Sequence, residues 1–275
     1  MAGFEIGAQG ILNSSTFSEI LPLLGSSNRG MRQETARLIG DLTSHRSVGQ
    51  PNNGWNQVVE KLELALRQAT VELLASTHPE LAIGAARLIG TIAEHHSDAA
   101  TMTTMIKKLN FSFDRIVVLL HHDDTRVERE GLSALCKIAY SNLTAQLIMD
   151  TTALESVVKL LNSPDHMVRL ESCRLIAKLS SHEDELSQLL AADPLPKLVQ
   201  LLRPRDARRL TNEALEALCQ IASWELGAKA ILSTPAAEDT ILHLELVDAE
   251  IIYWRAVLLG KLLKHRLKLR EEISN

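Results

Sequence analysis

Hydrophobic positions along this chain recur in a helical phrase that returns six times. The first two copies are Ala36-Arg-Leu-Ile-Gly-Asp-Leu42 and Ala86-Arg-Leu-Ile-Gly-Thr-Ile92, and each carries two aliphatic residues three positions apart. Because residues i and i+3 share a helix face, each copy predicts an amphipathic helix with one buried stripe. The aliphatic pairs are Ile39 and Leu42, Ile89 and Ile92, Leu135 and Ile138, Ile176 and Leu179, Leu218 and Ile221, and Leu259 and Leu262.

The six copies follow one another at a nearly constant spacing. Between the first residues of successive pairs the steps are 50, 46, 41, 42 and 41 residues. Repetition at such a period predicts a solenoid, in which each repeat packs on its neighbours and the stack forms one elongated domain. We therefore predict a single all-α domain over residues 1–275, with repeats at roughly 4–44, 55–95, 98–140, 142–181, 183–223 and 225–265.

Two further hydrophobic elements precede each phrase. The nearer one reads Val157-Val-Lys-Leu-Leu161 in the fourth repeat and Leu198-Val-Gln-Leu-Leu202 in the fifth, and a polar turn rich in Pro, Asn and Asp follows it. Residues of these types stop one helix and cap the next. A shorter element lies upstream again, around Leu189-Leu190, and ends near Pro194. The repeating unit is therefore predicted to be three helices, the first of them short.

Two segments depart from the regular spacing. The first two repeats are long, and the excess lies in residues 45–55, His45-Arg-Ser-Val-Gly-Gln-Pro-Asn-Asn-Gly-Trp55. Pro, Gly and Asn predict an exposed loop there, whose Trp55 either folds back onto the stack or contacts a partner. The segment 261–275 is a basic helix end, which we expect to close the last repeat.

These three helices in about 42 residues resemble the armadillo repeat. The second helix reads Ile/Val-x-x-Leu-Leu, and the third is similar to Glu-Ala-x-x-Leu-x-x-Ile. The clearest unit runs from Leu195-Pro-Lys-Leu-Val-Gln-Leu-Leu-Arg-Pro-Arg-Asp to Glu213-Ala-Leu-Glu-Ala-Leu-Cys-Gln-Ile-Ala222, and the resemblance covers about residues 4–265. It implies a right-handed α-solenoid. The two-helix HEAT repeat is the alternative, above all for the first two repeats.

In armadillo proteins the third helices line a concave groove. In the nuclear-import adaptors of this family, each third helix carries a Trp and, four residues later, an Asn that clamps an extended peptide. The Trp positions here hold Arg37, Arg87, Ser133, Arg174, Glu216 and Val257. The Asn positions hold Asp41, Thr91, Lys137, Lys178, Gln220 and Lys261. This departure from the Trp and Asn pattern argues against binding of nuclear-import signals.

Basic residues replace that pattern through the middle of the chain. This looks more like the catenin branch of the family, in which Lys and Arg in the groove receive acidic extended ligands. Arg also binds phosphate through two parallel hydrogen bonds, so a phosphorylated segment fits the same pattern. The candidate partner-binding residues are Arg87, Arg129, Lys137, Arg174, Lys178, Asn212, Gln220 and Lys261.

Two simpler interpretations of these charges stay open. The basic residues are also explained as solvated charges on helix faces, which contribute little individually. A column of acidic residues near the start of the third helices, Glu34, Glu130, Glu171 and Glu213, is explained by the favourable interaction of a carboxylate with a helix N-terminus.

Composition excludes several function classes. The net charge of −5 and a pI of about 6.1 argue against a nucleic-acid-binding domain, which is usually strongly basic. No apolar run reaches the roughly 18–20 residues of a membrane span, and the N-terminus lacks the pattern of a secretory signal. The three cysteines lie in repeated helices, so we expect reduced thiols and a cytoplasmic or nuclear location, or both.

The sequence carries no motif for catalysis, metal or cofactor binding. HExxH, Walker-type, GxGxxG, CxxC and GxSxG patterns are all absent from the chain, so we predict no enzyme, no cofactor and no metal site. The predicted function is a non-catalytic scaffold for an extended, acidic or phosphorylated protein segment. One alternative is a clamp on a folded partner, such as a chaperone nucleotide-exchange factor or an exchange chaperone of small GTPases. Another is self-association through Ile251, Ile252, Tyr253 and Trp254.

Overall fold

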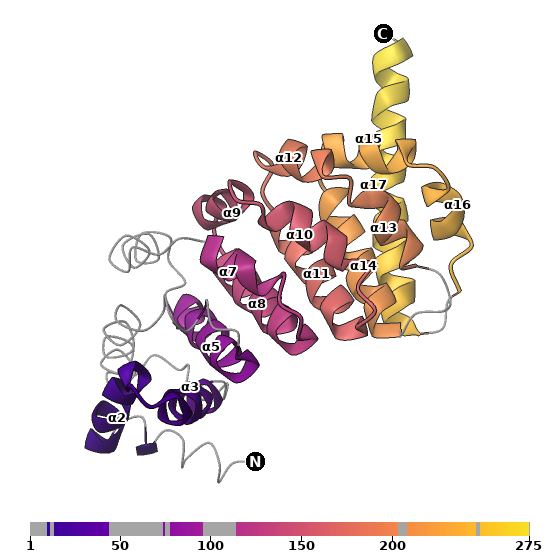
Figure 1. The fold of residues 1–275 in the computed structure, drawn as a ribbon. Coiled ribbons are helices and arrows are strands. Elements are labelled where there is room, and N and C mark those ends of the chain that lie inside the picture. Colours follow the sequence, from indigo (N-terminus) through magenta and orange to yellow (C-terminus); the bar gives the residue numbers. More distant parts are fainter. Residues whose placement is uncertain are drawn as a thin grey trace. The chain divides into compact units, whose positions relative to one another are not determined.

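The computed structural model describes residues 10–11, 14–43, 74, 78–95, 114–202, 208–245 and 248–274 of the 275-residue chain. Every regular element in these ranges is a helix, and the chain forms two compact units, residues 1–144 and 145–275 (Figure 1). The predictions of a single domain and of the repeat boundaries stay predictions. The loop 45–55, with Trp55, lies outside the described residues.

The helices of each unit follow in chain order. Those of the first unit are α2 Ser15–Ile20, the 3-10 helix η1 Leu21–Gly25, α3 Arg29–Thr43, α5 Pro79–His95, α7 Asp114–Leu119 and α8 Thr125–Ile138. Those that follow are α9 Asn142–Met149, which spans the division, α10 Ala153–Leu160, α11 His166–Leu179, α12 Leu186–Ala191, α13 Leu195–Gln200, α14 Arg208–Ile221, α15 Glu225–Ser233, α16 Ala237–Leu242 and α17 Ala249–Ser274.

All six repeated phrases fold as helices, namely α3, α5, α8, α11, α14 and α17. Within the first unit α3 packs on α5 and α5 on α8, and within the second unit α11 packs on α14 and α14 on α17. Most of the predicted stripe is buried, because residues such as Ile39, Leu135 and Leu218 have no exposed surface, but Leu259 on α17 is only half-buried. The 3.6-residue periodicity therefore placed the core of each unit correctly.

The second unit contains three successive triplets of helices. They are α9–α10–α11, α12–α13–α14 and α15–α16–α17, and the first helix of each has only six to nine residues. Helix starts follow the capping residues that the sequence offered. Asp124 accepts a hydrogen bond from the backbone of Arg126 at the start of α8, and Asp165 caps α11 in the same way.

Polar side chains link consecutive triplets by hydrogen bonds to backbone carbonyls about one repeat earlier in the sequence. Gln188 donates to the carbonyl of Met149 at 2.8 Å, and Lys197 donates to that of Val158 at 2.9 Å. The Trp224 indole donates to the carbonyl of Ser180, just after α11, at 2.7 Å. The last carbonyls of a helix have no partner inside it, so these side chains satisfy groups that the preceding repeat leaves open. Among the helices described, none is long and apolar enough to cross a membrane.

Candidate functional site

All eight candidate residues lie on third helices. Arg87 is on α5, and Arg129 and Lys137 are on α8 of the first unit. In the second unit the candidates are Arg174 and Lys178 on α11, Asn212 and Gln220 on α14, and Lys261 on α17. We call the first group, together with Glu130, the α5–α8 row. The second group, together with Glu171, Glu213, Glu216 and Glu250, is the α11–α17 row.

A single carboxylate oxygen organises the α5–α8 row. Oε1 of Glu130 accepts from Nη2 of Arg87 at 3.1 Å and from Nη2 of Arg129 at 3.2 Å. Arg87 reaches this oxygen from the neighbouring helix, so the ion pair also joins two repeats. Both arginine side chains remain about one-third exposed, at 31% for Arg87 and 35% for Arg129. Among the described side chains, Glu130 therefore faces two cations.

Lys137 adds a further cation to this row through a close approach of the two helices. A Cβ built on Gly90 would lie 2.9 Å from Cδ of Lys137 and 3.4 Å from Cα of Ala134. The stem of Lys137 therefore lies close over the backbone of α5, and a side chain at position 90 would displace it.

At the centre of the α11–α17 row, one arginine is shared by two glutamates. Nε and Nη2 of Arg174 donate to Oε1 of Glu213 on α14 at 2.9 and 2.6 Å, and Nη1 donates to Oε1 of Glu171 at 2.8 Å. One guanidinium thus holds two carboxylates. Burial raises the pKa of Glu171, and the charge of Arg174 works against that shift.

A third carboxylate stands beside this pair. Glu216 is half-buried on α14, and burial, followed by the charge of Glu213, raises its pKa. Lys178 and Arg174 act in the opposite direction. The Lys178 side chain is exposed and makes no hydrogen bond or ion pair with any described residue. Three carboxylates, Glu171, Glu213 and Glu216, therefore share the charges of Arg174, Lys178 and Arg209 at the centre of this row.

At the far end of the row, two candidates are used inside the fold. Nδ2 of Asn212 donates to Oε2 of Glu250 at 2.7 Å, while its buried Oδ1 has no partner among the described residues. Nζ of Lys261 donates to the carbonyl of Cys219 at 2.8 Å and to Oγ of Ser223 at 2.7 Å. A cation is favourable at the C-terminus of α14, so Lys261 has a structural role there. Gln220 is half-exposed.

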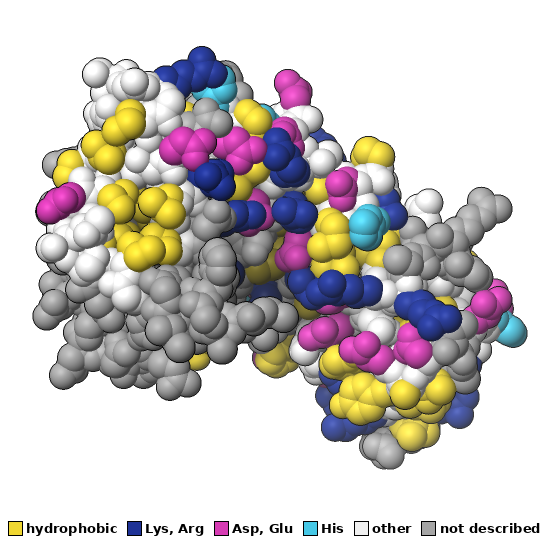
Figure 2. All heavy atoms as spheres, turned by 90° about the horizontal axis from the view of Figure 1, so that it is seen from below, with side chains coloured by type: hydrophobic (Ala, Val, Ile, Leu, Met, Phe, Trp, Pro, Cys, Tyr) yellow, Lys and Arg dark blue, Asp and Glu magenta, His cyan; other side chains and the backbone are white. Residues whose placement is uncertain are grey.

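The glutamates near the start of the third helices, Glu34, Glu130, Glu171 and Glu213, form ion pairs that the sequence analysis did not predict. Each of these glutamates is bonded to an arginine in the Trp position of its own or the preceding repeat. The pairs are Glu34 with Arg37, Glu130 with Arg87, Glu171 with Arg174, and Glu213 with Arg174. The i, i+3 spacing of Glu34 and Arg37 was a signal for the pairs within one helix. Accordingly, dark blue and magenta side chains lie side by side on the face shown in Figure 2.

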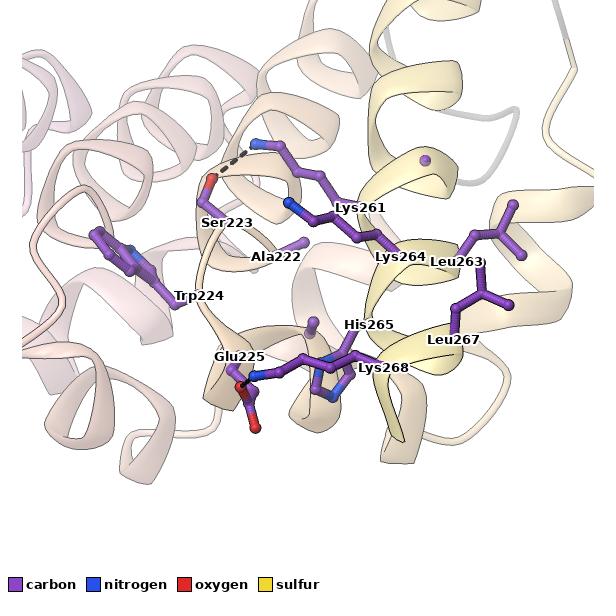
Figure 3. A pocket seen from close by; sticks show the side chains of 12 residues that line it. Ala222, Ser223, Trp224, Glu225, Lys261, Leu263, Lys264, His265, Leu267 and Lys268 are labelled. Atoms are coloured by element: carbon purple, nitrogen blue, oxygen red, sulfur yellow. Dashed lines mark hydrogen bonds and ion pairs between the residues drawn. The ribbon is translucent and has the colours of Figure 1, made fainter. Parts of the chain in front are cut away.

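One cavity of the second unit reaches this row at Lys261. Its volume is about 880 Å³, and it lies between the start of α15 and the side of α17 (Figure 3). Ser223 and Lys261 meet at one end, and Glu225 and Lys268 form an ion pair at the other, with Nζ 2.5 Å from Oε2. His265 is buried in its wall, and its Nε2 has no partner among the residues described.

No group of three or more His, Cys, Asp or Glu within the described ranges is placed to hold a metal ion. Burial raises the pKa of the Cys219 thiol to about 12, and its Sγ donates to the carbonyl of Trp254 at 3.3 Å. A thiol in that state is a poor nucleophile, so Cys219 is a packing residue.

The four residues considered for self-association divide into two pairs. Ile252 and Tyr253 are exposed on α17. Ile251 is buried and Trp254 is half-buried, with its ring 5.1 Å from that of Tyr253 in an edge-to-face arrangement.

Comparisons with known proteins identify the fold. No protein-family model matches the chain, and no curated protein matches it. Among solved structures, an engineered protein from the Northeast Structural Genomics Consortium shares 26% identity, with a TM-score of 0.76 over 90% of this chain and 98% of that one. A designed armadillo repeat protein in complex with the peptide (KR)4 shares 22% identity, with a TM-score of 0.75 over 90% and 99%.

A third similar structure is one of a set of computationally designed armadillo repeat proteins for modular peptide recognition. It shares 20% identity, with a TM-score of 0.74 over 89% of this chain and 99% of that one. The chain therefore has an armadillo-like repeat fold, an all-α solenoid. The resemblance seen in the repeated phrases is confirmed at the level of the fold.

Proposed function

We propose that this chain is a non-catalytic protein-binding scaffold, and that it holds an extended acidic segment of another protein against the α5–α8 row. The observation that carries the proposal is the arrangement of Arg87 and Arg129 around one oxygen of Glu130, with Lys137 on the same helix as Arg129. The Arg129 guanidinium has five N–H donors, and its contact to Glu130 uses only part of that capacity.

The acidic nature of the segment follows from the charge balance. Among the described side chains, Arg87, Arg129 and Lys137 lie in this row with one carboxylate, Glu130, whereas Arg174 is bonded to two carboxylates and a third, Glu216, stands beside them. An acidic ligand is attracted by the α5–α8 row and repelled by the carboxylates around Arg174. A phosphorylated side chain fits the same donors, because arginine binds phosphate through two parallel hydrogen bonds.

The fold comparison supports peptide binding as the mode. One similar designed protein is in complex with a basic peptide, (KR)4, and another was designed for modular peptide recognition. The basic residues in the Trp and Asn positions of this chain favour a ligand of the opposite charge. We further propose that the protein works in the cytoplasm or nucleus, where phosphorylated and acidic extended segments are accessible.

Binding of labelled peptides tests this function. The probes are a peptide of about 12 alternating Glu and Ser residues, long enough to cross two helices at about 3.3 Å per residue, and the basic (KR)4 peptide. Fluorescence anisotropy at low salt should show preferential binding of the acidic peptide, weakening as salt is added. Equal or tighter binding of (KR)4 would contradict the proposal, as would binding of neither peptide.

Matched charge reversals locate the site. Arg129→Glu combined with Lys137→Glu leaves the ion pair of Arg87 intact and should reduce affinity for the acidic peptide by about tenfold or more, roughly 1.4 kcal/mol. Arg115→Glu, on the second helix α7, is the control and should leave affinity unchanged. Circular dichroism checks that each variant is folded. If the double variant binds as tightly as the native chain, the ligand lies elsewhere.

A further inference from the structure

The cavity between α15 and α17 has no part in the proposed function. Its volume of about 880 Å³ lies within the range of roughly 300–1,000 Å³ that is typical of small-molecule sites. Its walls come from the turn after α14, from the start of α15 and from one side of α17 (Figure 3). A small molecule is therefore the kind of occupant that its size suits.

Close packing fixes the wall that α15 contributes. A Cβ built on Gly227 would overlap the carbonyl of Ile221, the last residue of α14, so a side chain at this position would push α15 away from α14. The indole of Trp224, just before α15, is held by its hydrogen bond to the carbonyl of Ser180 at 2.7 Å. The start of α15 is therefore anchored both to α14 and to the end of α11.

Apolar side chains make up much of the lining. Ala222 and Ala228 are buried in the wall beside α15, whereas Leu263 and Leu267 of α17 are 58% and 59% exposed. The two leucines are four residues apart and therefore lie on the same face of α17. An apolar ligand that lies along this face would remove the leucine side chains from water, which favours binding.

Two amines gather at one end of the cavity. Lys261 and Lys264 are three residues apart on α17, and Figure 3 shows both side chains pointing toward Ser223. Nζ of Lys261 donates to Oγ of Ser223, whereas Lys264 is exposed and makes no hydrogen bond or ion pair within the described ranges. Glu225 supplies the carboxylate among the described lining residues, and it is bonded to Lys268 at the opposite end. The Ser223 end therefore favours an anion.

The backbone at the start of α15 adds to this positive potential. The first N–H groups of a helix have no partner inside it, and the side chain of the N-cap residue Trp224 accepts from none of them. The start of a helix is also the positive end of its dipole. Both effects favour a negatively charged group in the cavity beside α15.

A buried histidine lies at the other end of the cavity. His265 is only 7% exposed, and its Nε2 is buried without a partner among the residues described. Figure 3 shows its ring turned from α17 toward the start of α15, beside Lys268. A buried polar atom without a partner costs free energy, and such atoms are rare in folded proteins. A hydroxyl suits either tautomer of the ring, because it both donates and accepts hydrogen bonds.

We propose that this cavity binds a small amphipathic carboxylate that carries a hydroxyl at its opposite end. The carboxylate lies at Lys261 and Lys264, the apolar body covers Leu263 and Leu267, and the hydroxyl meets Nε2 of His265. A single negative charge matches this site, because Lys264 is the lining lysine whose ammonium group no described residue holds. The ligand thereby satisfies the polar groups at both ends of the cavity and covers the leucines between them.

Chain-matched probes test the class of ligand. The stretch of α17 from Lys261 to Lys268 is about 10 Å long at a rise of about 1.5 Å per residue, so the probes are decanoate, decanol, decylammonium and ω-hydroxydecanoate. Calorimetric titration of the full chain should show decanoate binding with a Kd below about 1 mM and the alcohol and the amine binding at least about fivefold more weakly. The ω-hydroxyl should tighten binding about threefold, because Nε2 of His265 gains a partner.

Three results would overturn the proposal. Decanol or decylammonium that binds as tightly as decanoate would show that the cavity does not select an anion. Absence of carboxylate binding up to about 1 mM would show that there is no such site. An ω-hydroxyl that brings no gain would remove His265 from it.

Single substitutions locate the ligand. Lys264→Glu should weaken decanoate binding about tenfold and leave decanol binding within about twofold. Lys159→Glu changes another exposed lysine of the second unit, on α10, and as the control should leave both affinities unchanged. Circular dichroism checks that each variant is folded. A Lys264→Glu variant that binds decanoate as tightly as the native chain would overturn the proposal. Its failure leaves the peptide-binding proposal unaffected, because the α5–α8 row belongs to the first unit.

Discussion

The α5–α8 row and the α11–α17 row use the same ion pair in opposite electrostatic settings. In both, an arginine in the Trp position reaches the glutamate at the start of the next third helix, as Arg87 reaches Glu130 and Arg174 reaches Glu213. In the first row that glutamate is shared by a second arginine. In the second row the arginine is shared by a second glutamate, and Glu216 stands close by.

This difference shows that one repeat geometry carries either sign of charge. The ion pair that joins consecutive third helices is a structural element, and the residues around it decide whether the row attracts an anion or a cation. Counting cations down a column therefore overstates how basic a groove is, because the neutralising carboxylates come from the adjacent repeat.

The largest expected effect is on stability, and it separates the two rows. Arg174→Leu removes the guanidinium bonded to both Glu171 and Glu213, whose side chains are 12% and 14% exposed, and we expect the free energy of unfolding to fall by about 2 kcal/mol. Arg87→Leu leaves Glu130 still bonded to Arg129, and we expect a fall of about 1 kcal/mol or less. Urea unfolding of both variants measures the difference. Equal losses would show that the two ion pairs are energetically alike.

The next largest effect is on affinity for the acidic peptide, and it tests Glu130, the carboxylate that partly neutralises the α5–α8 row. Glu130→Gln removes the carboxylate shared by Arg87 and Arg129, so affinity for the acidic peptide should rise about fivefold, roughly 1 kcal/mol. Glu213→Gln is the matched change in the second row and should leave that affinity within about twofold. Anisotropy titrations compare them. A rise with Glu213→Gln alone would assign the acidic ligand to the second row.

A smaller effect follows from the close approach at Gly90. Gly90→Ala should displace the Lys137 stem, whose Cδ would lie 2.9 Å from the new methyl group, and lower acidic-peptide affinity about two- to threefold. Stability should change little, because the helix propensity gained, about 1 kcal/mol, opposes the crowding. Thermal unfolding and anisotropy measure the two quantities. Unchanged affinity would remove Lys137 from the binding site.

The smallest effect is the contribution of Glu216 to the pH dependence of stability. Because the folded-state pKa of Glu216 is raised, the folded protein holds this proton more tightly than the unfolded chain, and Glu216 makes stability fall as pH rises from about 4.5 through the raised value. Glu216→Gln should therefore be more stable than the native chain near pH 7, and this advantage should shrink near pH 4. Thermal unfolding at both pH values checks it. An advantage that grows toward low pH would contradict the sign.

Sequence reasoning identified the fold because repetition multiplies a weak signal. One phrase such as Ala36–Leu42 predicts only an amphipathic helix, but six copies at a period near 42 residues predict a stack. The capping role of Asp165 and the burial of Ile176 follow from local pattern and periodicity alone.

The bonding partners of the candidate residues could not be predicted from the sequence in this way. The distance between Arg174 and Glu213 depends on how two helices 39 residues apart in sequence pack together. The use of Lys261 to cap α14 depends on where the neighbouring helix ends. Aligning the six repeats shows which residues share a helix face. The hydrogen-bond and ion-pair partners of those residues depend on how neighbouring repeats pack.

A charge-swap binding experiment tests the central claim most directly. Affinities of the native chain and of the Arg129→Glu, Lys137→Glu variant would be measured for the Glu/Ser peptide and for an equivalent Lys/Ser peptide. We predict that the native chain prefers the acidic peptide and that the variant prefers the basic one. If both proteins show the same preference, the α5–α8 row does not select the ligand, and the proposed function is wrong.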